Sequence, residues 1–339
     1  FKVKISLCKG LKALITRYLK ERGKVMKLGF ITPNYPNEKR ICLLPQDISN
    51  FENEIIVEQN FGANLDISDS DYIKAGCKIS NRKDIFKECD AIVSLKLIQP
   101  SDYNNLRENQ MIIGWTHPTG SGKGFMEKQV VPKNLIIVDL DNIYPSVYYK
   151  DQKEKITWIK PNFVRENSFI AGYSATLHAF MTMGIFPNSS KKIAILGSGN
   201  VAQGAFFICS KFTEGINMFY RKTLNEFKDK LGEYDVIING IEVDKPNTHI
   251  LSFEDQKKLK DSCLIIDAAA DAGNAIEGTV YTALDKPIYK KDNLYYYEVN
   301  NAPSIFYRES SRVISKAFSE NVYKKDVKIF KELIFNSKA

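Results

Sequence analysis

The sequence predicts an α/β protein with two doubly wound parallel-sheet domains and an active-site cleft between them. Three observations support this fold class. Apolar β-rich runs alternate with helical stretches in two successive series, a long helical stretch separates the series, and a glycine-rich turn opens the second one. Continuous Ile, Val and Leu runs are typical of parallel strands, because helices cover both faces of such sheets. With 339 residues, 44% of them hydrophobic, the chain is long enough for two domains with separate cores.

The first series of apolar runs begins at residue 27. Helical patterns fit between the runs, for example at 81–89 and 124–129. An order of strand, helix and strand indicates parallel pairing. The strand candidates are KLGFI (27–31), EIIVEQ (54–59), AIVSLK (91–96), MIIGWTH (111–117) and LIIVDLD (135–141).

A polar patch at 150–162 interrupts the pattern, and a helical stretch follows from about Phe163 to Gly184. Its small residues allow the close packing that a helix bridging two domains requires. The last stretch, from Ser304 to about Leu333, has mixed helical spacing and could fold back on either domain. The second series lies between these two stretches. Its strand candidates are 191–197, 216–222, 235–241, 262–270 and 294–301, and its helix candidates are 200–212, 223–232 and 253–260.

The formal net charge of +8 is concentrated at the start of the chain. Residues 1–25 hold eight of the 48 basic residues and one of the 40 acidic ones, so the remainder is nearly neutral. A nucleic-acid partner is not expected, because no basic stripe lies on the predicted domains. The basic leader is either an extension outside the fold or an amphipathic targeting or membrane helix. For 26–339 we expect no membrane contact, since no apolar run approaches the ~18 residues of a spanning helix.

Cysteines and histidines do not indicate a metal site. The six cysteines form no CxxC pair, and the three histidines are far apart in the sequence. Scattered cysteines suit a reducing compartment, so a cytoplasmic location is expected.

The strongest local signal is the turn in ILGSGNVAQGA (195–205), which follows a strand and opens a helix. Gly197 permits the tight turn, and Gly199 lets the backbone approach a pyrophosphate. Ala202 allows the helix to pack on the strand, and the helix N-terminus, at Asn200 and Val201, offers N–H groups to the anion. A strand-to-helix turn without a ligand is the alternative, but the βαβ context favours a Rossmann-like dinucleotide site.

The end of the next strand predicts which dinucleotide binds. An acidic residue there would bind the ribose hydroxyls of NAD, whereas this chain has Arg221 and Lys222. Arg221 can bind a 2′-phosphate bidentately, with Lys222 assisting. NADP is therefore favoured over NAD, and a solvated basic pair is the alternative.

Three polar residues of the first half lie at strand ends or in the loops that follow strands. Arg40 suits carboxylate recognition, Lys96 can hold a carbonyl or carboxylate, and His117 can move protons near neutral pH. Singly, each has an ordinary alternative: a surface ion pair, an edge lysine with an exposed ammonium, or a turn histidine. Their similar topological positions favour a common catalytic role.

Polar residues also follow the last strands of the second half. Asp267 ends a strand and Asp271 follows it closely, while Asn300 and Asn301 precede Pro303. We expect them to line the cleft on the nicotinamide side. A helix cap at Asp271 and a simple turn at Asn301 are the alternatives.

Taken together, these segments resemble the alanine dehydrogenase and transhydrogenase-domain superfamily. The similarity runs from about Met26 to the C-terminal helix and leaves the leader outside. Two departures are an alanine at Ala202, where alanine dehydrogenases usually have glycine, and Tyr220-Arg221 in place of an acidic residue. The segments that carry the resemblance are KRICLLP, SLK, WTHPTG, the AGYSA helix, ILGSGNVAQGA, DAAADAG and VNNAPS.

The resemblance implies the following organisation. A leader occupies 1–25, a catalytic substrate domain 26–160, and an NADP-binding domain 161–302, while a C-terminal helix at 303–339 completes the catalytic domain. It also implies a homo-oligomer.

For the site, the resemblance implies that Arg40 and Lys96 bind a 2-oxo acid and that His117 acts as acid and base. Asp271 and Asn301 would lie near the nicotinamide.

Within the superfamily, the resemblance is closest to enzymes that join pyruvate to the side-chain amine of ornithine through an imine reduced by NADPH. Lysine remains open as the amine. An alanine or saccharopine-type dehydrogenase is the nearest alternative. A non-catalytic NADP-binding module is an alternative of another class, which would not need Arg40, Lys96 and His117.

Overall fold

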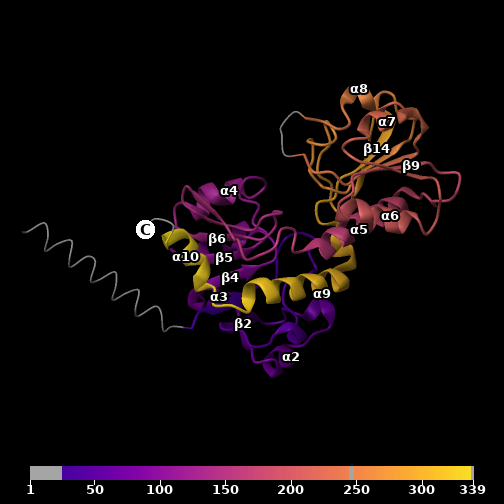
Figure 1. The fold of residues 1–339 in the computed structure, drawn as a ribbon. Coiled ribbons are helices and arrows are strands. Elements are labelled where there is room, and N and C mark those ends of the chain that lie inside the picture. Colours follow the sequence, from indigo (N-terminus) through magenta and orange to yellow (C-terminus); the bar gives the residue numbers. More distant parts are fainter. Residues whose placement is uncertain (1–24, 244–247, 337–339) are drawn as a thin grey trace, which may run out of the picture. The chain divides into compact units, whose positions relative to one another are not determined.

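The computed structural model describes residues 25–243 and 248–336, so the predicted leader lies outside the described residues except for Val25. The chain divides into two compact units (Figure 1). The first unit comprises residues up to Asn34, Cys42–Pro161, and Phe318 onward; the second comprises Tyr35–Ile41 and Asn162–Ala317. The contacts thus place residues 303–317 with the second unit, and the chain returns to the first unit about 15 residues later than the boundary proposed from the sequence.

The first unit is built on an eight-stranded sheet in the order β3-β2-β1-β4-β5-β6-β7-β8. The six strands from β3 to β6 pair in parallel, and β7 and β8 add an antiparallel edge. The central strands are fully buried, which explains their uninterrupted apolar sequences. The strands are β1 (Lys27–Phe30), β2 (Glu54–Glu58), β3 (Lys78–Ser80), β4 (Ala91–Ser94), β5 (Met111–Gly114), β6 (Ile136–Asp139), β7 (Ser146–Tyr149) and β8 (Gln152–Lys155).

Short helices connect these strands. Helix α3, for instance, begins where Asn81 Oδ1 accepts a hydrogen bond from the Asp84 amide and buries Ile85 and Phe86 beside β1 and β2. The helices are α2 (Asp69–Lys74), α3 (Arg82–Glu88) and α4 (Lys123–Phe125), which continues into a π-helical turn, η4 (Met126–Val130). Single 3₁₀ turns are η1 (Pro45–Asp47), η2 (Ala63–Leu65) and η3 (Pro100–Asn105).

The end of the chain completes the first unit through η7 (Ser319–Tyr323) and α10 (Lys328–Asn336). Asn53 fixes this segment: its Nδ2 donates to the carbonyls of Tyr323 and Lys325, and its Oδ1 accepts from the Val327 amide. The Phe30 and Tyr323 rings also pack edge to face, with centroids 4.9 Å apart. The predicted terminal helix is therefore broken by a π-helical turn and a bend.

The second unit contains a six-stranded sheet in the order β10-β9-β11-β12-β14-β13, parallel except for the edge strand β13. Alternate residues of the central strands belong to two different apolar clusters, one on each face, so both faces of this sheet are covered. The strands are β9 (Ile193–Leu196), β10 (Ile216–Phe219), β11 (Val236–Asn239), β12 (Leu264–Asp267), β13 (Ile288–Lys291) and β14 (Leu294–Tyr297).

The helices of the second unit include the long stretch that the sequence predicted. That stretch forms α5, and it ends at Gly184, whose φ of +68° suits glycine at a helix C-terminus. The helices are α5 (Arg165–Met183), α6 (Asn200–Cys209), α7 (Leu224–Lys228), α8 (Phe253–Gln256) and α9 (Tyr307–Phe318), with 3₁₀ turns η5 (Leu231–Glu233) and η6 (Ala302–Phe306).

Two glycines let the backbones of α5 and α6 touch. A Cβ at Gly172 would lie 1.8 Å from the Val201 carbonyl oxygen, and one at Gly204 would lie 2.0 Å from that of Phe169. Neither position has room for a side chain. The crossing therefore fixes α6, and with it the glycine-rich turn at its start, against the longest helix of the unit.

Candidate functional site

The glycine-rich turn joins β9 to α6 with the predicted backbone geometry. Gly197 has a φ of +112°, which disfavours any residue with a side chain, and Ala202 is fully buried against the Gly240 backbone. Gly199 precedes the helix, and no side chain caps the helix N-terminus. A Cβ at Gly199 would meet nothing within 4 Å, so the space over the first N–H groups of the helix is open. These features fit a pyrophosphate at the start of α6.

Arg221 and Lys222 follow β10, the strand beside β9, and both are exposed. Arg221 Nη2 donates a hydrogen bond of 3.0 Å to the Glu242 carbonyl, which follows β11. This contact holds the guanidinium at the carboxyl edge of the sheet, the edge at which open α/β sheets bind their ligands.

In the first unit, a loop after β5 holds His117. The backbone of His117 is left-handed, with a φ of +45°, which is uncommon for a residue with a side chain. Its carbonyl accepts hydrogen bonds from the Gly120 and Gly122 amides at 3.0 and 2.9 Å. Gly122 has no room for a Cβ, which would lie 1.9 Å from the Thr116 carbonyl oxygen. The WTHPTGSG segment thus folds into a compact turn around one histidine.

Asp139, the last residue of β6, holds the same loop from the neighbouring strand. Its Oδ1 accepts from the amide and hydroxyl of Thr116, both at 2.9 Å, and from the His117 amide at 3.3 Å. Its Oδ2 accepts from Asn142 Nδ2 at 2.5 Å. Burial raises the pKa of this carboxyl, and Asp141 adds to the rise, while the donors on Thr116 oppose it.

The His117 imidazole is paired with Asp141. Nδ1 lies 2.9 Å from Asp141 Oδ2, and the two side chains are about one-third exposed (32% and 36%). Burial by itself would lower the pKa of His117, but the neighbouring Asp141 carboxylate outweighs that effect and raises it. This arrangement orients the ring and leaves Nε2 for proton transfer.

Lys96 lies beside this pair, two residues beyond β4. It is 8% exposed, and its Nζ lies 5.5 Å from the centre of the Trp115 ring. Its positive charge opposes the rise in the pKa of His117. Strands β4, β5 and β6 are neighbours, so the structure brings together Lys96, His117 and Asp141 at one edge of one sheet.

Arg40 belongs to the second unit and has a different environment from the one expected. It is 1% exposed, and its guanidinium forms a bidentate ion pair with the Glu38 carboxylate. Nε donates to Oε1 at 2.7 Å and Nη2 to Oε2 at 2.6 Å. Nη1 donates to Asn167 Oδ1 at 3.4 Å. The bidentate edge expected to meet a substrate carboxylate is thus bound to a carboxylate of the chain itself.

Asp271 and Asn301 follow the neighbouring strands β12 and β14 of the second unit. Asp271 is partly buried, and its Oδ1 accepts from Asn274 Nδ2 at 2.6 Å. Asn301 is buried, and its Nδ2 donates to the Pro36 carbonyl at 3.4 Å. Both therefore lie at the same edge of the sheet as the glycine-rich turn.

Sequence reasoning missed Glu38, Asp139, Asp141 and Glu298 as functional candidates. The run LIIVDLD showed both aspartates directly after an apolar run, which is the signal that singled out Asp267. Glu298 stands inside YYYEVNN, where a charged residue follows a buried strand. Among residues 25–243 and 248–336, no group of three or more His, Cys, Asp or Glu side chains is arranged to bind a metal ion.

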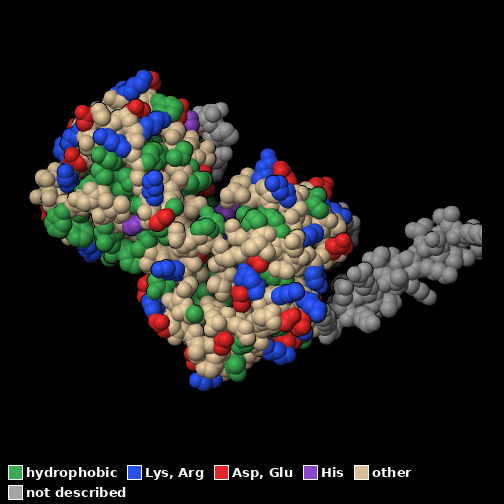
Figure 2. All heavy atoms as spheres, turned by 180° about the vertical axis from the view of Figure 1, so that it is seen from behind, with side chains coloured by type: hydrophobic (Ala, Val, Ile, Leu, Met, Phe, Trp, Pro, Cys, Tyr) green, Lys and Arg blue, Asp and Glu red, His purple; other side chains and the backbone are tan. Residues whose placement is uncertain are grey.

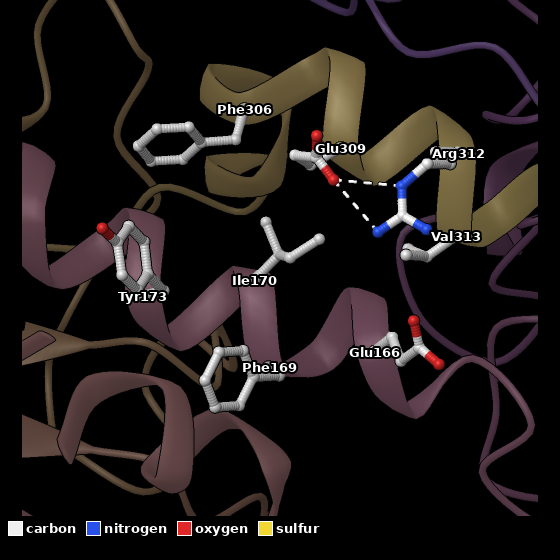
Figure 3. Close-up of a pocket in the computed structure, with 8 residues that line it drawn as sticks. All are labelled: Glu166, Phe169, Ile170, Tyr173, Phe306, Glu309, Arg312 and Val313. Atoms are coloured by element: carbon white, nitrogen blue, oxygen red, sulfur yellow. Dashed lines mark hydrogen bonds and ion pairs between the residues drawn. The ribbon is translucent and has the colours of Figure 1, made fainter. Parts of the chain in front are cut away.

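A groove between α5 and α9 lies within the second unit and outside these sites (Figure 3). Phe169, Ile170 and Tyr173 of α5 face Phe306 and Val313, and a Glu309–Arg312 ion pair of 3.1 Å lies at its polar side. Figure 2 shows further hydrophobic side chains on the surface of the same unit. None of the residues predicted for the site lines the groove.

Two domain models of one protein family match the chain. The N-terminal domain of the alanine dehydrogenase/PNT family matches residues 33–146, and its C-terminal domain matches 202–339. An L-alanine dehydrogenase structure superposes with a TM-score of 0.70 at 17% identity, over 92% of this chain and 93% of that chain. A transhydrogenase from Sinorhizobium meliloti gives a TM-score of 0.70 at 15% identity, over 91% of this chain and 95% of that chain.

Curated sequence relatives share a higher identity with this chain than these two structures do. The N(5)-(carboxyethyl)ornithine synthase of Clostridium botulinum is 60% identical over 91% of this chain and 98% of its own length. That of Lactococcus lactis subsp. lactis is 52% identical over the same shares. Alanine dehydrogenase 1 of Staphylococcus aureus is 24% identical over 82% of each chain.

The two parallel sheets, the glycine-rich turn and these matches define an NAD(P)-dependent oxidoreductase of the alanine dehydrogenase type. Within that class, the chain belongs to the N(5)-(carboxyethyl)ornithine synthase family. Among the described residues, no helix has the length and hydropathy needed to cross a membrane.

Proposed function

We propose that this protein joins pyruvate to the side-chain amino group of ornithine by NADPH-dependent reductive condensation. The names of the relatives at 52–60% identity support the reaction. The structural observation that carries it is the grouping of Lys96 with the His117–Asp141 pair at the ends of three adjacent strands. A cation beside an oriented imidazole is what the condensation of an amine with a 2-oxo acid requires.

The chemistry assigns a task to each of these groups. The neutral amine attacks C2 of pyruvate to form a carbinolamine, which loses water to give an imine. His117 carries one proton from the attacking nitrogen to the carbonyl oxygen and then, as an imidazolium, gives a second proton taken from solvent to the departing hydroxyl, so water leaves and a protonated imine remains. Lys96 polarises the carbonyl as negative charge develops on its oxygen. The bound nicotinamide supplies the hydride that reduces the imine carbon.

Asp141 keeps the His117 ring in one orientation for both proton transfers. With Nδ1 directed at Asp141, only Nε2 is left to exchange protons with the substrates. The raised pKa of His117 keeps a larger fraction of the ring protonated near neutral pH, ready to donate to the hydroxyl.

The assignment of Arg40 to the pyruvate carboxylate requires that Glu38 give up at least one of its two hydrogen bonds. An Arg40→Ala variant decides this. A rise in the KM for pyruvate with little change in kcat supports the assignment, and an unchanged KM excludes it.

The choice of NADPH rests on Arg221 and Lys222. Both are exposed beside the glycine-rich turn, and no acidic residue stands at the end of β10. A carboxylate there would repel a 2′-phosphate, whereas the guanidinium can bind it. Asp271 and Asn301 are proposed to lie near the nicotinamide, with Asp271 in a catalytic role.

The direct test is NADPH consumption with pyruvate and a panel of amines. Oxidation with ornithine but not with ammonia supports the proposal, and oxidation with lysine in addition would widen its substrate range. Oxidation with ammonia alone would make the protein an alanine dehydrogenase. No oxidation with any amine would favour a binding module. Repeating the panel with NADH tests the cofactor preference.

The proposal includes a cytoplasmic location and assembly of several copies. Five described cysteines are free and buried, as suits a reducing compartment. Exposed apolar residues on the second unit, such as Phe206 and Phe207 of α6, are candidates for contact between copies. Light scattering after gel filtration measures the number of copies.

A further inference from the structure

Two buried carboxylates lie side by side in the second unit, and only one of them was noticed in the sequence. Asp267 ends β12, and Glu298 follows β14, the neighbouring parallel strand. The register pairs Ile266 with Tyr297, so the next residues along the two strands are Asp267 and Glu298. Asp267 is 1% exposed and Glu298 is 0% exposed.

These carboxylates have few hydrogen-bond donors. Asp267 Oδ1 accepts from Asn239 Nδ2 at 2.9 Å. Among the residues that the structure describes, Asp267 Oδ2 and both oxygens of Glu298 have no hydrogen-bond partner. The Thr279 side chain lies close enough to Glu298 to lower its pKa, but the Thr279 hydroxyl donates to the Ile276 carbonyl at 3.1 Å. Buried carboxylate oxygens without a donor are costly, and two adjacent negative charges increase that cost.

One proton shared by the two side chains supplies a missing hydrogen-bond donor and reduces the two adjacent negative charges to one. A neutral Glu298 can donate its O–H to Asp267, which leaves a single negative charge on the pair. Burial raises the pKa of Glu298 to about 10 and that of Asp267 to about 6; the Asp267 carboxylate adds to the rise for Glu298, and Asp271 adds to the rise for Asp267. Asp271, Tyr281 and Tyr289 are the other titratable groups whose charges interact with the pair.

The pair lies at both ends of the segment that carries Asp271. Asp267 immediately precedes this segment, and the left-handed Ala270, with a φ of +55°, turns the chain just before Asp271. At the other end, the Glu298 amide donates to Thr282 Oγ1, and the Thr282 amide donates to the Glu298 carbonyl, both at 3.1 Å. Whatever holds Asp267 against Glu298 therefore also holds the two ends of this segment together.

We propose that Glu298 and Asp267 share one proton and that this bond positions the segment carrying Asp271, which makes Glu298 a positioning residue for the reaction. The role in the reaction rests on the proposed function of Asp271, whereas the shared proton does not. A buried neutral acid at this position keeps a second negative charge away from Asp271.

The shared proton is tested by the pH dependence of unfolding, which needs no substrate. A carboxyl with a raised pKa in the folded state stabilises the fold below its ordinary pKa of 4.5, and that stability is lost as the pH rises toward about 10. Glu298→Gln removes this loss, because the amide does not ionise and can still donate to Asp267. The Tm of this variant minus that of the wild type should therefore increase as the pH rises from about 6 to about 9.

Glu254→Gln is the matched control, since Glu254 is 76% exposed on the same unit. Its difference from the wild type should stay constant over the same pH range. An equally constant difference for Glu298→Gln would overturn the shared proton.

Kinetics test the positioning role. Glu298→Gln should keep kcat within about threefold of the wild type, while Glu298→Leu, which fills the space without a donor, should lower kcat about tenfold or more with little change in the KM for NADPH. Equal kcat values for the two variants would overturn the positioning role. A selective rise in the KM for ornithine in Glu298→Gln would also overturn it, because it would show that the carboxylate binds the amine.

If the wild type consumes no ornithine while the Tm result holds, the proposed function fails and the shared proton stands.

Discussion

Asp139 in the first unit and Asp267 in the second occupy the same kind of position and are stabilised differently. Each is the last residue of a buried parallel strand, and each is almost completely buried, at 0% and 1% exposed. Asp139 accepts four hydrogen bonds, which cover both of its oxygens. Asp267 accepts one side-chain hydrogen bond, its Oδ2 has no hydrogen-bond partner among the described residues, and its side chain interacts with the Glu298 carboxyl group.

The difference shows how one sequence signal can have two physical outcomes. Donors from the WTHPTG loop converge on Asp139, so an ionised carboxylate can remain buried and hold the loop of His117. Around Asp267, the Asn239 side chain and the Ala269 and Ala270 amides lower the pKa, but burial outweighs them, so we propose that its neighbour Glu298 is neutral. One aspartate thus positions its loop by accepting N–H and O–H groups, and the other by sharing a proton.

The largest effect on activity is expected at His117, which lies in the loop that Asp139 holds. His117→Ala should lower kcat/KM for pyruvate and ornithine about 100–10,000-fold, because it removes the group that moves protons in the condensation. NADPH oxidation measures the loss. His178→Gln on α5 of the second unit is the control and should keep nearly full activity. A fall of less than tenfold for His117→Ala would remove His117 from the mechanism.

The comparison itself is tested by making the same substitution at both aspartates. Asp139→Asn replaces one carboxylate oxygen by an NH2 group, which cannot accept the hydrogen bonds that the loop donates. The free energy of unfolding should therefore fall by about 2–4 kcal/mol. Asp267→Asn should change it by less than about 1 kcal/mol at neutral pH, since the amide can still accept from Asn239 and can donate to Glu298. Urea denaturation measures both, and equal losses would contradict the distinction.

A smaller effect is expected at the cofactor end of the second unit. Arg221→Ala should raise the KM for NADPH about tenfold or more, since a hydrogen bond to a charged group contributes about 1.5–3 kcal/mol. The KM for NADH should hardly change. Lys257→Ala, at the exposed residue that follows α8, is the control for a lost positive charge. Similar changes for both cofactors in Arg221→Ala would show that Arg221 does not read the 2′-phosphate.

The smallest effect is a shift in pH dependence. Asp141→Asn removes the carboxylate that raises the pKa of His117, so the limb of the kcat/KM profile that reports this histidine should move to lower pH. The stability that this ion pair gives is present below the ordinary pKa of 6.5 and is lost as the pH rises through the raised pKa. The variant should therefore lose stability at acidic pH only. An unmoved limb would mean that Asp141 does not pair with His117 in the working enzyme.

The sequence predicted the architecture well because buried parallel strands and the Gly197–Ala202 turn depend on local patterns. It grouped Arg40, Lys96 and His117 by their similar positions after strands, and the structure brings Lys96 and His117 to one sheet edge, while Arg40 belongs to the other unit. It did not reveal the partners: Asp141 for His117, Glu38 for Arg40, and Glu298 for Asp267. Those contacts depend on strand order and register, which a single sequence does not determine. Strands β3, β7, β8 and β13 were also missed, because they are short and β3, β8 and β13 have polar, partly exposed sequences rather than apolar runs.

Mass spectrometry after incubation with pyruvate, ornithine and NADPH deuterated at C4 identifies the product of the reaction. We expect N(5)-(carboxyethyl)ornithine with deuterium on the carbon that was C2 of pyruvate, and no product when either substrate is omitted. Ornithine and pyruvate left unreacted, or labelled alanine formed when ammonia replaces ornithine, would contradict the proposed function.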